Sequence, residues 1–266
     1  MNYHPSLIAQ RLMAHVEGTR NERAREHARS QVVERLPFTV RLVQRYADLA
    51  KAVGIRQAAY ARHLPDFAST LHRPEAADFA DGAVVMLAES KLDGSALGSV
   101  RIQTNFTHPL ELEAAVALPL WLQARRLAEV TRLGVGQGRM GHLVKTALVK
   151  GCFEYCEYNE VDWAVVTARS AVERHYEQLL FTDVFADNQA IPLPHVGNIE
   201  HRVMAFEIAT GEARWEAARH RLLPFFRHTR HPDIDVRIRP MYAMSPQGDQ
   251  TVRRQAVGPT FGLVAA

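Results

Sequence analysis

Residues 127–153 read LAEVTRLGVGQGRMGHLVKTALVKGCF, and this stretch decides the fold. Apolar and β-branched residues around Val130 predict a strand, which ends in a glycine-rich turn at Gly134, Gly136, Gly138 and Gly141. Apolar residues from Leu143 onward recur at helical spacing, so a helix follows the turn. A strand, a glycine loop and a helix in this order aim several backbone N–H groups and the positive end of the helix at one spot. A phosphate or a developing oxyanion fits there.

Two charged residues stand in this otherwise apolar strand. They are Glu129 and Arg132, and charges in such positions are usually paired or functional. Residues three apart in an extended strand point to opposite faces, so we expect these two side chains not to pair with each other.

The rest of the chain predicts further strands and helices around this unit. Strands are expected at residues 37–42, 84–89, 97–103, 161–167 and 201–208, and helices at 46–63 and 169–180. Asp93-Gly94 is a hairpin signal between the second and third of these strands. The spacing is that of one mixed sheet flanked by helices.

The residues E-V-T-R at 129–132 resemble the Glu-x-x-Arg strand of the autoinducer (acyl-homoserine-lactone) synthases and the related N-acyl amino acid synthases. Both are GNAT-like acyltransferases. Further positions that match this pattern are Arg56 with Tyr60, Asp78 with Asp81, and Arg101 in Gly98-Ser99-Val100-Arg101. The lactone synthases carry a tryptophan between the aromatic residue and the aspartate pair, and this chain has none there. That departure favours the N-acyl amino acid branch.

The resemblance implies a fold, a domain organisation and an activity. The expected fold is α/β (α+β), a GNAT-like acyl-CoA N-acyltransferase fold with a mixed central β-sheet flanked by helices. We expect this domain at residues 37–208, an N-terminal helical extension at 1–36, and a C-terminal helical extension and tail at 209–266. The implied activity is transfer of a long-chain acyl group from acyl carrier protein to the amine of an amino acid. Alternatives are a lactone-type autoinducer synthase, an acyl-CoA-dependent GNAT acyltransferase and a non-catalytic GNAT-fold binding module.

Acyl transfer to an amine requires a proton acceptor and donors for the tetrahedral oxyanion. By resemblance, Glu129 is expected to accept the amine proton, and Arg132 to serve orientation or carboxylate binding. Tyr176 is expected to protonate the leaving thiolate, since residues 176–181 resemble the GNAT pattern Tyr-x-x-x-Gly-Phe, with Leu180 in place of the glycine. The alternative for Glu129 is a charge partner of Arg101 without a chemical role.

Several residues are expected to bind the substrates. The backbone N–H groups near Leu133 and Val135 are expected to face the thioester carbonyl. The phosphate loop comprises Gly138, Arg139 and Gly141, and it is degenerate against the GNAT pattern Arg/Gln-x-x-Gly-x-Gly/Ala. An incomplete loop favours acyl carrier protein as the donor, with acyl-CoA as the alternative.

Three more positions are expected at the substrates on weaker grounds. Arg56 and Tyr60 lie one helical turn apart, so they can hold a substrate carboxylate or an acidic side chain from a neighbouring loop, and an ordinary amphipathic helix explains the spacing equally well. Trp121 lies in residues 107–126, which are too apolar for a plain surface loop. This segment either lines a groove for the acyl chain or packs as a core helix.

Composition narrows the partners and the compartment. The net charge is +3. Basic residues gather near the C-terminus, and they form either a solvated helix face or a docking face for an acidic partner such as the carrier protein. These residues are Arg214, Arg219, Arg221, Arg227 and Arg230. Basic residues are not interleaved with aromatics, so nucleic acid is not an expected partner. No apolar run approaches the ~20 residues of a membrane span, and we expect a cytoplasmic protein.

Cysteine and histidine spacing gives no cofactor signal. Cys152 and Cys156 are expected to be reduced residues of the core or of a helix face. The pairs His228 with His231 and His195 with His201 lack a third ligand at a recognisable spacing, so we expect neither a metal site nor a resident cofactor.

Overall fold

The computed structural model describes residues 32–170, 172–186, 189–193 and 198–237. Most of the expected N-terminal helical extension, and the tail from residue 238, lie outside the described residues.

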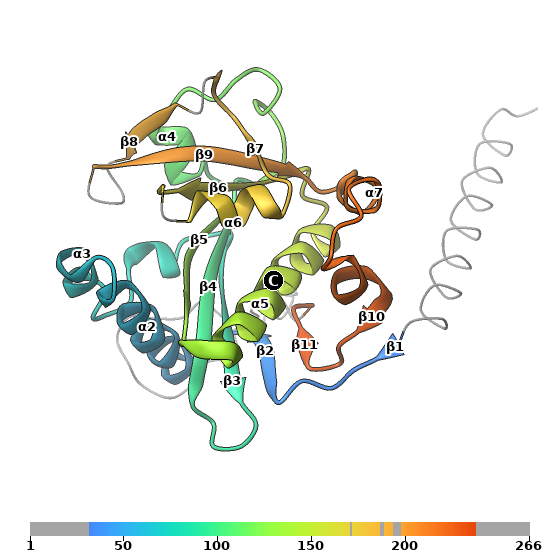
Figure 1. The fold of residues 1–266 in the computed structure, drawn as a ribbon. Coiled ribbons are helices and arrows are strands. Elements are labelled where there is room, and N and C mark those ends of the chain that lie inside the picture. The colour runs from blue at the N-terminus through green and yellow to red at the C-terminus, as the bar shows by residue number, and fades with distance from the viewer. Residues whose placement is uncertain (1–31, 171, 187–188, 194–197, 238–266) are drawn as a thin grey trace, which may run out of the picture.

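A nine-stranded mixed sheet forms the centre of the molecule (Figure 1). Its order is β11-β2-β3-β4-β5-β6-β9-β7, and β8 pairs with β9 beside this path. The strands are β2 (Phe38–Leu42), β3 (Ala83–Ser90), β4 (Ala96–Thr104), β5 (Leu127–Val135), β6 (Trp163–Ala168), β7 (Thr182–Asp183), β8 (Ala190–Leu193), β9 (Ile199–Glu207) and β11 (Ile234–Asp235). Among the described strands of this sheet, only the pairs β5–β6 and β11–β2 are parallel. The predicted mixed sheet is therefore confirmed.

Helices cover both faces of this sheet. The long helix α5 (Gly138–Tyr158) lies on one side of β3, β4 and β5, and α2 (Tyr46–Ala61) with α3 (Pro65–Thr70) lies on the other (Figure 1). Shorter elements are the 3-10 helix η1 (Ala76–Asp78), α4 (Glu111–Ala115), α6 (Glu173–Gln178), α7 (Gly211–Ala217) and the π-helix η4 (Pro224–His228). A separate two-stranded ribbon pairs β1 (Val32–Val33) with β10 (Thr229–Arg230).

The two faces of β4 differ in character because its side chains alternate. Val100 and Ile102 belong to the apolar core under α5. Ser99 points the other way, where its hydroxyl donates to the carbonyl of Ala52 in α2. Arg101 and Gln103 share that second face and are buried. The sequence thus places buried polar groups between the sheet and α2.

The apolar segment at residues 107–126 contributes to a second core on the α2 side of the sheet. Leu110, Leu112 and Leu122 are buried there against residues of β6 and β9. Trp121 is 39% exposed and meets Trp163 edge to face. These three leucines therefore follow the core alternative, whereas Leu120 is exposed.

Strand β5 contains a bulge in its second half. Arg101 lies opposite Thr131, but Ser99 lies opposite Gly134, so β5 has one residue more than β4 over this interval. Within the bulge, Arg132 has a left-handed φ of 57°. The bulge turns the Arg132 side chain to the face that Glu129 occupies, so the predicted opposite orientation is wrong. Simple alternation holds only in an unbroken strand.

The glycine loop between β5 and α5 is closely packed. A Cβ on Gly141 would lie 1.9 Å from the carbonyl oxygen of Gly136, which is backbone and cannot swing away. We predict that Gly141→Ala lowers the free energy of unfolding by about 1–3 kcal/mol, the usual range for overpacking.

Urea titration measures this change, and Gly54→Ala is the matched control. Gly54 sits in α2 with no atom within 4 Å of an added Cβ, so alanine there should raise stability by about 0.4–1 kcal/mol. Equal stability changes in both variants would contradict the packing of the loop.

Candidate active site

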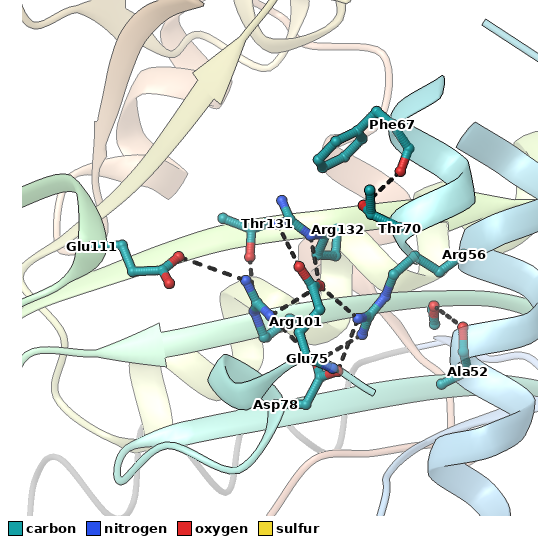
Figure 2. Close-up of polar contacts among 11 residues, drawn as sticks. Ala52, Arg56, Phe67, Thr70, Glu75, Asp78, Arg101, Glu111, Thr131 and Arg132 are labelled. Carbon is teal, nitrogen blue, oxygen red and sulfur yellow. Dashed lines mark hydrogen bonds and ion pairs between the residues drawn. The ribbon is translucent and has the colours of Figure 1, made fainter. Parts of the chain in front are cut away.

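Three buried arginines from three elements converge on the carboxylate of Glu75 (Figure 2). Arg56 of α2 donates from Nη1 to Oε2 at 3.0 Å, and Arg101 of β4 donates to the same oxygen at 3.3 Å. Arg132 of β5 binds both oxygens, from Nε at 2.8 Å and from Nη2 at 2.7 Å. Glu75 thus connects α2, β4 and the bulge of β5.

Asp78 completes this cluster from η1. It accepts two hydrogen bonds from Arg56, at 3.0 and 2.9 Å, and one from the backbone N–H of Glu75 at 2.9 Å. Burial alone would raise the pKa of each carboxyl, but the arginines outweigh it and hold the pKa of both Glu75 and Asp78 below the ordinary values. Both carboxylates are therefore ionised and offset the buried positive charge.

These contacts identify the partners of two of the predicted arginines. Arg101 contacts Glu75, Asp78 and Glu111 and donates to the Thr131 hydroxyl at 3.2 Å, and its positive charge also favours the ionised form of Glu129. Glu75 lies in an irregular segment where no periodicity marked it. For Arg56, the alternative of an acidic side chain from a neighbouring loop is confirmed by Asp78. Asp81 is exposed, 3.7 Å from His108.

A cavity of about 320 Å³ opens next to this cluster. It lies between the second half of β5, the ends of β6 and β9, α6 and the end of α2. Pairing between β5 and β6 stops after Glu129, which leaves room for it. Five predicted residues line the cavity, namely Tyr60, Arg132, Leu133, Val135 and Tyr176.

The other predicted residues do not line this cavity. Glu129, Arg56 and Arg101 are buried beyond its wall. Gly138 and Arg139 lie exposed at the start of α5, where Gly141 packs on Gly136, and Trp121 lies against Trp163.

The charged side chains that line the cavity are basic. They are Arg62, Arg132, Lys145 and Arg169, accompanied by His63, His175 and His201. No carboxylate is among the described lining residues. The cavity therefore favours a carboxylate, a phosphate or a developing oxyanion over a cation. Sequence analysis missed Lys145, Arg169 and His201, because only the folded sheet brings them together.

Glu129 and Tyr176 are both perturbed by burial. Glu129 is 2% exposed, and burial raises its pKa to about 7, although the backbone N–H of Leu112 favours the ionised form. Burial also raises the pKa of the Tyr176 phenol, so this group is protonated at neutral pH. Tyr176 packs edge-on against Phe181, and between them Leu180 has a left-handed φ of 68°. The backbone here takes the conformation that explains a glycine in the GNAT pattern.

The mixed sheet with its bulged strand, the glycine loop and the helix that follows form a GNAT-like acyl-CoA N-acyltransferase fold. The family model for N-acyl amino acid synthase FeeM matches residues 51–204, which is more than half of the chain. The protein therefore belongs to the N-acyl amino acid synthase family, a family of N-acyltransferases. The match includes α2 from residue 51 onward, Glu75, Arg101, β5, α6 and His201.

Comparison with solved structures found similarities at low sequence identity, and the similarity to FeeM shows the fold. FeeM, an N-acyl amino acid synthase from uncultured soil microbes, is 14% identical with a TM-score of 0.54, over 68% of this chain and 97% of that one. The CoA-dependent acyl-homoserine lactone synthase BjaI is 12% identical with a TM-score of 0.47, over 73% and 93%. An acyl-CoA N-acyltransferase from Pseudomonas aeruginosa is 14% identical with a TM-score of 0.41, over 63% and 98%. A search of curated proteins found no match.

Other sequence expectations concern cysteine, metal and membrane. Cys152 and Cys156 are free and buried in the core, as predicted. Ligand atoms of Glu212, Glu216 and His228 lie within 4.8 Å of one another, a grouping that sequence spacing did not reveal, and Glu212 also pairs with Arg227. Over the described residues, the helices are too short or too polar to cross a membrane.

The Glu75 cluster makes a direct prediction about stability. Arg101→Ala should lower the free energy of unfolding by about 3 kcal/mol or more, because its side chain is 1% exposed and its removal leaves buried carboxylates with less compensation. Chemical denaturation measures this loss. The matched control is Arg45→Ala, where the side chain is 75% exposed and little should change. A loss within measurement error for Arg101→Ala would show that the cluster does not stabilise the fold.

Proposed function

We propose that the protein transfers a long-chain acyl group from acyl carrier protein to the amine of an amino acid. The observation that carries this proposal is the cationic cavity beside the bulged strand, in a chain of the N-acyl amino acid synthase family. A cavity that favours anions suits a substrate whose carboxylate is charged and whose amine must become neutral before it attacks.

The acyl chain has a candidate path on the other face of the sheet. A small apolar pocket of about 30 Å³ shares Val130, Leu133 and Tyr176 with the large cavity and continues to Cys152, Leu179 and Phe181. A thioester at Leu133 would therefore place its carbonyl beside the cavity and its first methylenes in apolar surroundings. A longer chain requires side chains such as Phe181 to move. Trp121 is left out of this path, since it packs on Trp163.

Three residues are proposed to serve the reaction. Glu129 accepts a proton from the amine through a water, because its carboxylate is buried beyond the cavity wall and its pKa of about 7 lies near neutral pH. Arg132, fixed by Glu75, orients the reacting groups and adds positive charge near the oxyanion. Tyr176 lines both pockets, and its protonated phenol supplies a proton to the leaving thiolate.

The N–H groups near Leu133 and Val135 are proposed to hold the thioester carbonyl. At the outer end of the cavity, Arg62 donates to the carbonyl of Val135 at 2.8 Å. Gly138, Arg139 and Gly141 follow at the start of α5 and are proposed to hold the phosphate of the pantetheine arm. Tyr60 forms the opposite wall, while Arg56 and Arg101 act through Glu75.

A carrier-protein donor also needs a docking face. Among the basic residues near the C-terminus, Arg214 donates to the carbonyl of Leu180 and Arg227 pairs with Glu157 and Glu212. Arg219, Arg221 and Arg230 are exposed, and Arg219 and Arg221 lie close together in the chain after α7, whereas Arg230 belongs to β10. The proposed docking face is therefore reduced to Arg219 and Arg221.

Replacement of Glu129 tests its role. Glu129→Gln should lower turnover by about 10²-fold or more, because it removes the base and keeps the volume. The rate of N-acyl amino acid formation is measured at saturating substrates, and binding of the acyl donor should be unchanged. Wild-type turnover in this variant would reject the role.

Stability provides the control for Glu129→Gln. The folded-state pKa of Glu129 is raised from 4.5 to about 7, so the stability that its proton contributes is full below pH 4.5 and is lost as pH rises through about 7. The variant should therefore be at least as stable as wild type above that range.

The donor is tested by initial rates with the same acyl chain on carrier protein and on CoA, at low and high salt. Carrier protein should be the better donor, because the incomplete glycine loop holds the nucleotide of CoA poorly and the carrier adds an acidic surface. High salt should weaken the preference, since exposed charges are screened beyond ~8 Å at physiological ionic strength.

Charge reversal locates the docking face. Arg219→Glu with Arg221→Glu should slow the carrier-protein reaction and leave the CoA reaction unchanged, whereas Arg73→Glu, at another exposed position, should affect neither. Equal efficiency of both donors at low salt would reject carrier protein as the preferred donor and favour an acyl-CoA-dependent enzyme.

A further inference from the structure

Two basic residues with no role in the proposed chemistry meet at the junction of β6 and β9. These strands pair antiparallel, with Thr167 opposite Val203 and Ala168 opposite Arg202. The next positions along this register are Arg169 and His201, and both line the cavity together with Thr167. Directly opposed residues in such a pair have Cβ atoms about 4.5–5.5 Å apart. Arg169 and His201 therefore present two different functional groups to one small ligand.

The hydrogen bonds of His201 fix its tautomer. Its Nδ1 lies 2.7 Å from the carbonyl oxygen of Ile199, and a carbonyl can only accept, so Nδ1 carries a proton and donates. In the neutral ring, Nε2 is then an acceptor with a lone pair. Burial and the positive charges of Arg169 and Arg132 lower the pKa of His201 below 6.5, so the ring is neutral at pH 7.

Arg169 is differently placed from its basic neighbours. Arg132 is held by Glu75, and Arg202 is held by Glu173, Glu177 and Asp183. Within the described part of the chain, the Arg169 guanidinium has neither a hydrogen bond nor an ion pair. It lines the cavity, where no described carboxylate competes for it. A bound anion is the natural partner for such a group.

We propose that Arg169 and His201 together hold the amino acid substrate: Arg169 pairs with its carboxylate, and Nε2 of His201 accepts the first proton from its ammonium group. This inference rests on the proposed function. An α-amino acid separates its two charged groups by a single carbon, which matches two residues that face each other across adjacent strands. A lone carboxylate or phosphate would need only Arg169.

The protons balance with two acceptors. The ammonium passes one proton to Nε2 of His201, and its lone pair then forms the C–N bond while the thioester carbonyl becomes an oxyanion. The second N–H proton leaves through water to Glu129 as the oxyanion collapses and the C–S bond breaks. The thiolate takes a proton from Tyr176, which regains one from His201, and Glu129 releases the other to solvent. Amide, free thiol and one proton result.

The test begins with the purified full-length protein and dodecanoyl carrier protein. The common L-amino acids are screened first, and the best one is then compared with its α-carboxamide, which keeps the amine and lacks the negative charge. Arg169→Gln should raise the KM for the amino acid at least tenfold, leave the KM for the donor unchanged and erase the preference over the carboxamide. Arg169→Lys should restore part of that preference.

His201→Asn separates the base from the structural bond, because the asparagine amide can still donate to the carbonyl of Ile199. It should lower kcat about 10²-fold. The matched control is His72→Asn, since His72 has the same kind of contact, Nδ1 at 2.8 Å from the Ser69 carbonyl, but is exposed outside the cavity lining. This control should keep the wild-type rate. If His201→Asn melts early, His201→Gln is used at a temperature where it is folded.

The pH profile distinguishes His201 from Glu129. Each base must be unprotonated to act, so the wild-type kcat should fall as pH is lowered. Two protonations should cause the fall, that of Glu129 near pH 7 and that of His201 below pH 6.5. The pH profile of His201→Asn should keep only the protonation step near pH 7, and that of Glu129→Gln should keep only the step below pH 6.5. The groups that act on His201 are Arg169, directly after β6, and Arg132 of β5. The other titratable or charged residues that line the same cavity are Tyr60, Arg62, His63, Lys145, His175 and Tyr176.

Several outcomes would overturn the inference. An unchanged KM and an unchanged carboxamide ratio in Arg169→Gln would remove Arg169 from the carboxylate, and a two-proton profile in His201→Asn would remove the base. If wild type acylates no amino acid with any donor, the proposed function fails. Calorimetric titration of the amino acid into the protein then still tests the amino acid subsite. Binding by wild type that is lost in Arg169→Gln supports the subsite, and a wild type that does not bind the amino acid rejects it.

Discussion

The carboxylate of Glu75 is the constraint on which the site depends. It gathers Arg56, Arg101 and Arg132 from a helix and two strands, and each of these guanidiniums is almost fully buried. Buried cations are costly unless paired and fully hydrogen-bonded, so Glu75 and Asp78 must be present for α2 to lie against the polar face of β4. The short turn at η1 thus decides whether helix and sheet can pack at all.

The same pairing accounts for the bulge in β5. A left-handed φ at a residue other than glycine carries a cost, and at Arg132 the two hydrogen bonds to Glu75 offset it. The bulge also ends the regular alternation of β5 just where its pairing with β6 stops. Cavity and ion cluster are therefore two results of one local geometry. At the cavity wall, Arg132 is paired with Glu75, whereas Arg169 has no carboxylate partner among the described residues.

Sequence periodicity predicted the central strand, the glycine loop, α2 and α5, because alternation and helical spacing are local. The resemblance to a family pattern, not periodicity, singled out Tyr60 and Tyr176, which line the cavity. Periodicity failed where geometry depends on partners distant in sequence. A period of two assumes no bulge, so Arg132 was placed on the wrong face, and Glu75 stands in a segment without a pattern. Arg169 and His201 meet only through the register of β6 and β9.

The two faces of the sheet divide the demands of acyl transfer. Under α5 the core is apolar, which suits an alkyl chain, and toward α2 it carries the ion cluster, which suits charged groups. An acyl thioester has both characters within a few bonds, so its reactive carbon must lie where the faces communicate. Val130, Leu133 and Tyr176 line pockets on both sides, at the point where β5 and β6 part. We propose that the reacting bond lies there, because a shift toward either face would bury a charge in the core or expose the acyl chain to the arginines.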